Sequence, residues 1–124
     1  MTATAKALKA FFSSFGVSAW PEGCVPMDEK LPYITYTLEE PEWGVPAVLQ
    51  ARVWTRSDSF APVNALTAAI LRSVGRGVLV PAGSGSICIR PGSPLAQHMP
   101  MPGEPELKVN YLNFQLDSYH IQGE

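Results

Sequence analysis

The sequence predicts an α+β fold with two layers, in which a mainly antiparallel β-sheet carries two helices on one face. Two segments place apolar residues at helical spacing, one near the amino terminus and one in the middle of the chain. Five other segments have the composition or the alternation of strands. The order is helix, two strands, helix and three strands, and 124 residues fit one domain, which we take as residues 1–124.

The first helix is predicted over residues 4–15. Four large apolar side chains follow the i, i+3, i+4, i+7 spacing of one helical face: Leu8, Phe11, Phe12 and Phe15. Thr2 or Thr4 can cap its start, and Gly16 stands where a left-handed residue would end it. Residues 17–22 then form a short extended passage or edge strand anchored by Trp20.

Two strands follow, over residues 32–38 and 47–55. The first is almost wholly β-branched or aromatic. The second alternates, so that one face carries Leu49, Ala51 and Val53 and the other Gln50, Arg52 and Trp54. Because the connection over residues 39–46 is short, we expect the two strands to pair as an antiparallel hairpin.

The second helix is predicted over residues 59–74. Its start has cap residues in the Ser57–Asp58–Ser59 stretch and a proline, Pro62, that only a first turn tolerates. Its apolar face consists of Val63, Leu66, Ile70, Leu71 and Val74. Gly75 marks its end.

Three strands complete the chain, two short ones over residues 78–80 and 86–90 and a last one over residues 111–119. A long irregular loop is predicted over residues 91–108, because its five prolines lack the N–H that a central strand must donate. In the last strand Leu112, Phe114 and Leu116 are expected to point inward, and Asn113, Gln115 and Asp117 outward.

Composition favours a soluble protein of the reducing cytoplasm. The formal net charge is −2, the basic residues are scattered, and no apolar run is long enough to span a membrane. Charged residues make up only 16%, which fits either a surface covered by partners or a surface that has few charges and binds nothing. The two cysteines, Cys24 and Cys88, are expected to be free and buried, although a disulfide between them stays open.

No motif indicates catalysis, a cofactor or a metal. His98 and His120 have no ligand partner at metal-binding spacing, and the acids at 39, 40 and 42 have no second cluster. The Gly-Ser-Gly-Ser stretch at 83–86 lacks the ending of a phosphate loop, so a hairpin turn is the better interpretation. We therefore expect a protein that is not an enzyme and that uses no cofactor.

The features that remain point to interfaces. One candidate patch lies on the proline-rich segment, with Leu95, Met99 and Met101, and the other on the polar faces of two strands, with Gln50, Arg52, Asn113 and Gln115. Trp43, in the turn at 39–46, is a further candidate interface anchor.

The chain resembles the tail terminator and tail completion proteins of long-tailed bacteriophages and prophages. The features that carry the resemblance are the Leu-Pro-Tyr-Ile-Thr-Tyr stretch at 31–36, the Arg-Val-Trp-Thr strand at 52–55, the following helix, and the closing strand at 111–116. Each feature is short, but together they cover most of the chain in order.

This resemblance implies a homo-oligomeric ring, typically hexameric, at the head-proximal end of the tail tube. Such a ring ends tail polymerisation and joins the head, with the major tail tube protein and head connector or neck proteins as partners. DNA passes through it without specific binding, and the protein resides in the virion after assembly in the bacterial cytoplasm. Two alternatives stay open: a neck or head–tail connector subunit, and a small-molecule-binding or hydrolytic domain that uses His98.

Overall fold

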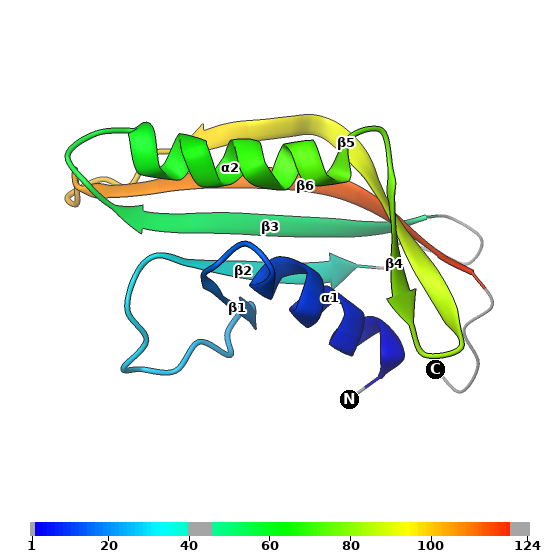
Figure 1. Cartoon of the computed structure of the whole chain (residues 1–124). Coiled ribbons are helices and arrows are strands. Elements are labelled where there is room, and N and C mark those ends of the chain that lie inside the picture. Colours follow the sequence, from blue (N-terminus) through cyan, green and yellow to red (C-terminus); the bar gives the residue numbers. More distant parts are fainter. Residues whose placement is uncertain (1, 40–45, 120–124) are drawn as a thin grey trace.

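The computed structural model describes residues 2–39 and 46–119 of the chain. Within them, two helices and six strands build one domain (Figure 1). The elements in chain order are α1 (Ala3–Ser13), β1 (Ser18–Pro21), β2 (Tyr33–Glu39), β3 (Ala47–Arg56), α2 (Ala61–Val74), β4 (Val78–Ala82), β5 (Gly85–Met99) and β6 (Leu107–Tyr119). The sheet has the order β1-β2-β3-β6-β5-β4, and every neighbouring pair is antiparallel except β1 and β2. The predicted α+β fold is confirmed.

Helix α1 begins where the sequence predicts. The hydroxyl of Thr2 accepts a hydrogen bond from the amide of Ala5 at 3.0 Å and so satisfies one of the free donors of the first turn. On its apolar face, Phe12 is completely buried and stacks on Tyr36 of β2, with the ring centroids 5.2 Å apart. The strand β1 that follows is the predicted edge strand, and the Lys9 ammonium lies 3.8 Å from the centroid of the Trp20 ring.

The predicted hairpin of β2 and β3 is confirmed, with Tyr36 opposite Ala51. Leu49, Ala51 and Val53 are all completely buried, as the alternation of β3 requires. Removing an aliphatic side chain of the size of Leu49 or Val53 from water stabilises the fold by about 1.5–3 kcal/mol.

Helix α2 starts two residues later than predicted, and the predicted cap is wrong. Its N-cap is Phe60, whose side chain makes no capping bond. The serines ahead of it form local turns instead: Ser57 Oγ accepts from the amide of Ser59 at 3.1 Å, and Ser59 Oγ from that of Ala61 at 3.4 Å. The predicted end is confirmed, because the amide of Gly75 donates to the carbonyl of Leu71 and its φ is +55°.

Both helices cover the same face of the sheet, here called the inner face. Phe12 of α1 packs on Tyr36, which lies opposite Ala51 of β3, and Ala51 lies opposite Leu112 of β6. Asn110, two residues before Leu112 and so on the same side, donates hydrogen bonds to α2. The opposite face, here called the outer face, has no helix packed against it within the described residues.

The prediction of a proline-rich loop over residues 91–108 is wrong for most of this segment. Strand β5 continues to Met99, β6 already begins at Leu107, and the two pair at both ends of an irregularity between Pro91 and Ala96. The reason lies in the neighbouring strand, since β4 pairs only with residues 85–89 of β5. Beyond Ile89, β5 is an edge strand, where a proline can turn its missing donor toward solvent.

Gly92 lets this irregular part of β5 approach β6 closely. A Cβ atom at this position would lie 2.9 Å from the main-chain oxygen of Asn113. Side chains essentially never come that near to a backbone atom, so the close pairing of the two strands depends on a residue without a Cβ.

In the described part of the chain, neither helix has the length and hydropathy that a membrane-spanning helix needs.

A candidate assembly surface on the outer face of the sheet

The outer face gathers the polar side chains that the sequence singled out on two separate strands. β3 and β6 are neighbours, and their register places Gln50 opposite Asn113 and Arg52 opposite Tyr111. Gln115 follows on the same side of β6 and is exposed. The alternation of each strand is visible in the sequence, but the adjacency of the two strands is decided by the sheet topology.

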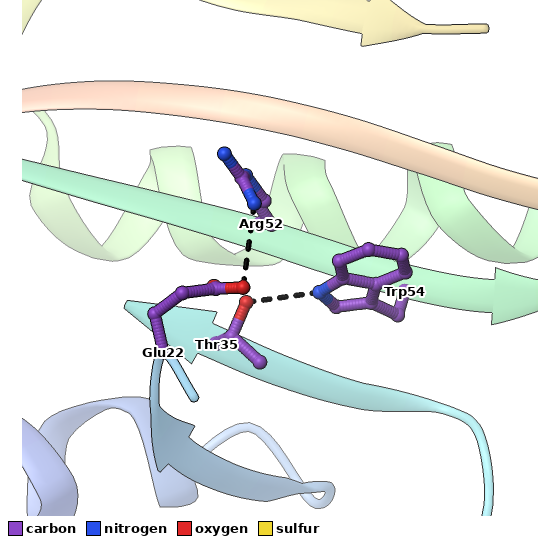
Figure 2. A network of polar contacts seen from close by, with 4 residues as sticks. All are labelled: Glu22, Thr35, Arg52 and Trp54. Carbon is purple, nitrogen blue, oxygen red and sulfur yellow. Dashed lines mark hydrogen bonds and ion pairs between the residues drawn. The ribbon is translucent and has the colours of Figure 1, made fainter. Parts of the chain in front are cut away.

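A hydrogen bond between side chains ties β3 to β2 on this face (Figure 2). The indole Nε1 of Trp54 donates to Thr35 Oγ1 at 2.9 Å. The Trp54 ring also lies beside Tyr33, with the centroids 6.2 Å apart, and Thr35 is only 1% exposed. A threonine on a face without helices is buried because the indole fixed by this bond helps to cover it.

Arg52 is held by an acidic neighbour and an aromatic one. Its guanidinium lies 3.3 Å from the carboxylate of Glu22, which follows β1 (Figure 2). It also lies 5.5 Å from the centroid of the Tyr111 ring of β6. Both charged side chains are about one-third exposed, and such partly exposed ion pairs contribute only about 0–1 kcal/mol to stability. The pair therefore acts mainly by orienting Arg52 on the surface.

Asn113 belongs to the outer face, as predicted, but it is only 9% exposed. Its amide nitrogen Nδ2 donates to the main-chain oxygen of Pro94 at 2.8 Å, so the irregular part of β5 covers it. Leu95, from the same part of β5, packs against the hydrophobic core. These two candidate residues are therefore engaged within the chain.

The remaining candidates lie toward one end of the sheet or outside the described residues. Met99 is half-buried opposite Val109 of β6, which is completely buried, and Met101 follows β5 and is also half-buried. The amide of Glu104 donates to the Met101 carbonyl at 3.1 Å, which closes the short turn that remains of the predicted loop. Trp43 lies outside the described residues.

A second fixed arginine, which the sequence did not single out as a site, marks the other end of the outer face. Arg90 lies 3.4 Å from the carboxylate of Asp117 and donates a hydrogen bond to the hydroxyl of Tyr119 at 3.0 Å. A hydrogen bond with the side chain of Cys88 is the main reason that the pKa of Arg90 is raised above its ordinary value, with Tyr119 and Asp117 adding to it. The signal in the sequence is the alternation of Cys88 with Arg90, which puts both on one face.

His98 lies in a polar cluster at the start of α2. The Asn110 amide nitrogen donates to Asn64 Oδ1 at 3.1 Å and to Thr67 Oγ1 at 3.0 Å, so its Oδ1 is left to accept from His98 Nδ1 at 3.4 Å. The ring of Phe60 packs edge-on against the imidazole, with the centroids 4.8 Å apart. The contacts of His98 thus come from an amide and a phenyl ring, and they connect β5 to β6 and to the residue that precedes α2.

The other residues considered for chemistry are placed as follows. No group of three or more His, Cys, Asp or Glu side chains suited to a metal ion occurs within residues 2–39 and 46–119. Both cysteines are free, and the prediction that both are buried is wrong for Cys24, which is exposed. His120 and the acids at 40 and 42 lie outside the described residues.

No protein-family model matches this chain, and no curated protein matches it.

Proposed function

We propose that this chain is a structural subunit of a bacteriophage tail. Copies of it assemble as a hexameric ring at the head-proximal end of the tail tube, end tube polymerisation and present the surface that joins the head. Its partners are further copies of itself, the major tail tube protein and the neck proteins, and DNA passes through the ring. In this proposal the chain is not an enzyme and its place is the virion.

The observation that supports the proposal is the outer face of the sheet. It combines half-buried aromatic rings, at Trp54 and Tyr111, with uncharged amides, at Gln50 and Gln115. Protein interfaces have this composition, with aromatic anchors and arginine enriched and other charged groups depleted at the centre.

The arginines of this face are already fixed before any partner arrives. Arg52 is held by Glu22 and Tyr111, and Arg90 by Asp117 and Tyr119. A side chain that is ordered in the free subunit loses less conformational entropy on association, so the same contacts give higher affinity. The family resemblance of the sequence gives this assembly surface its proposed setting in a phage tail.

Subunit mass is the first test. We expect the purified chain to give the mass of a hexamer by multi-angle light scattering. The double variant Gln50→Glu/Gln115→Glu places two negative charges on the outer face and should shift the mass toward the monomer, with the circular dichroism spectrum unchanged.

The matched control is Ala65→Glu/Ser73→Glu, which adds the same two charges to exposed positions of α2. It should leave the hexamer intact. A wild-type protein that stays monomeric at every concentration tested would contradict the ring, and a hexamer in the Gln50→Glu/Gln115→Glu variant would remove the outer face from the proposal.

Tail tubes provide the functional test. The wild-type chain, added to polymerising tail tube protein, should shorten the tubes and appear at one end of each tube in negative-stain electron microscopy. Binding to head connectors without any effect on tube length would instead identify a neck connector subunit.

A further inference from the structure

Met27 is presented to solvent at the tip of an ordered turn. The amide of Glu29 donates to the carbonyl of Pro26 at 3.0 Å, which closes a turn with Met27 and Asp28 at its corner. A preceding turn is closed by the amide of Cys24 on the carbonyl of Pro21. The Met27 side chain is completely exposed, so it packs against nothing in the described part of its own chain. A flexible thioether side chain of this kind adapts readily to an irregular apolar cavity.

A hollow of about 300 Å³ lies between α1 and the turn that joins β4 to β5. Its lining residues are Ala3, Lys6, Ala7 and Ala10 from α1, Pro81 and Ala82 from the end of β4, and Gly83 from the β4–β5 turn. Most of the lining residues are alanine or glycine, and these small residues leave the space open. At one end the two walls are close together, since a Cβ on Gly83 would lie 3.0 Å from that of Ala3. Among its described lining residues only Lys6 is charged, so this hollow suits an apolar side chain better than a polar small molecule.

The charges beside the two features are complementary. Lys6 at the hollow is exposed, and within the described ranges 2–39 and 46–119 its ammonium takes part in no hydrogen bond or ion pair. Asp28, next to Met27, is exposed as well and carries the opposite charge. A methionine that enters the hollow from another copy would bring this carboxylate toward Lys6.

The two features lie at opposite ends of the molecule. The loop between β1 and β2 stands at one end of the sheet, whereas the β4–β5 turn and the start of α1 lie at the other (Figure 1). A chain therefore cannot fill its own hollow, so the contact must join two copies, and in the proposed ring it is head-to-tail. Such a heterologous contact repeats from copy to copy and closes into a ring when the rotation allows it.

We propose that Met27 of one copy inserts into the hollow between α1 and the β4–β5 turn of the next copy, with Asp28 facing Lys6. This contact rests on the proposed ring, because it adds one head-to-tail contact to the interface between neighbouring copies. It uses surfaces distinct from the outer face, so the two can be tested separately.

Crosslinking between differently labelled copies tests the contact directly. One chain carries Met27→Cys and the other Ala10→Cys, both in a Cys24→Ser background that removes the exposed native thiol. A short bismaleimide should join the mixed chains and neither chain alone. The matched control replaces Ala10→Cys by Leu79→Cys, an exposed residue of β4 that does not line the hollow, and should give no product.

Charge reversal tests the pairing. Lys6→Glu alone and Asp28→Lys alone should each weaken self-association, and the double variant Lys6→Glu/Asp28→Lys should restore it. Met27→Ala should raise the dissociation constant about tenfold, as truncation of an interface anchor does. Because all three side chains are exposed, the variants should fold like the wild type, which circular dichroism checks.

The outcomes separate this contact from the proposed function. If Met27→Ala forms the same ring as the wild type and positions 27 and 10 do not crosslink, the proposed contact is wrong and the ring is unaffected. If the crosslink forms but the assemblies neither bind tail tubes nor shorten them, the contact is supported and the phage-tail function is wrong. Chains that remain monomeric and uncrosslinked overturn both.

Discussion

Asn113 and Pro94 join two strands through a bond between a side chain and the backbone. The amide nitrogen of Asn113 in β6 donates to the main-chain oxygen of Pro94 in β5 at 2.8 Å. It lies where the regular pairing of the two strands is interrupted, between Pro91 and Ala96. The bond thus fixes a segment that cannot be held by an uninterrupted ladder of backbone hydrogen bonds.

Asn113→Ala should lower the free energy of unfolding by about 1 kcal/mol, since one such hydrogen bond is lost. Urea denaturation followed by circular dichroism measures the change. Gln115→Ala, two residues further along the same face but exposed, is the control and should change stability by less than about 0.5 kcal/mol. Equal effects of the two variants would show that the bond to Pro94 contributes nothing.

Gly92→Ala should destabilise the protein because the added methyl group meets the backbone of β6. The new Cβ would lie 2.9 Å from the oxygen of Asn113, so the strands must separate, at a cost of about 1–3 kcal/mol. The same urea titration measures it, with Gln97→Ala at an exposed position of β5 as the control. A Gly92→Ala variant as stable as the wild type would mean that β5 shifts without cost.

The bond between Trp54 and Thr35 should appear as a coupling energy in a double-mutant cycle. Trp54→Phe removes the donor and leaves the hydroxyl of Thr35, which is 1% exposed, without this partner. The costs of the two single variants, Trp54→Phe and Thr35→Val, should therefore add up to more than the cost of the double variant, and the difference is a coupling energy of about 0.5–1.5 kcal/mol. Strictly additive effects would show that the two groups do not interact.

Tyr36 should make the stability fall at alkaline pH. Burial of its ring, and to a lesser extent the charge of Cys24, raise the pKa of Tyr36 above the ordinary value of 10.0. Below pH 10.0 both the folded and the unfolded chain keep the proton, and the full stability is present. As the pH rises from there through the raised folded pKa, the unfolded chain loses its proton more readily, so this stability is lost.

The measurement compares urea midpoints at about pH 8 and about pH 10.5. Tyr36→Phe should show a smaller loss between the two than the wild type, whereas Tyr33→Phe, which removes a half-buried tyrosine of the same strand, should retain the full loss. An identical pH dependence in Tyr36→Phe and the wild type would contradict the role of Tyr36.

The candidate site could be predicted only in part. The alternation of β3 and β6 puts Gln50, Arg52 and Gln115 on outward faces, but nothing in either strand says that the two strands are neighbours. The sequence also does not reveal the ion-pair partner of Arg52, since Glu22 lies thirty residues away in the chain. The exposure of Met27 and the hollow beside Gly83 depend on packing between distant segments, and no local pattern reports them.

The sequence by itself determined the helices and the faces of the strands, because these follow from the 3.6-residue and two-residue periods of local backbone geometry. The tertiary structure decided where α2 starts, since the serine hydroxyls ahead of it bond within their own turns. It also decided the conformation of the proline-rich segment. Prolines exclude a strand only where both edges need donors. The length of β4 determines whether β5 has a second neighbour beyond Ile89, and β4 does not extend past that point. The segment that the sequence predicts as a loop is therefore an edge strand.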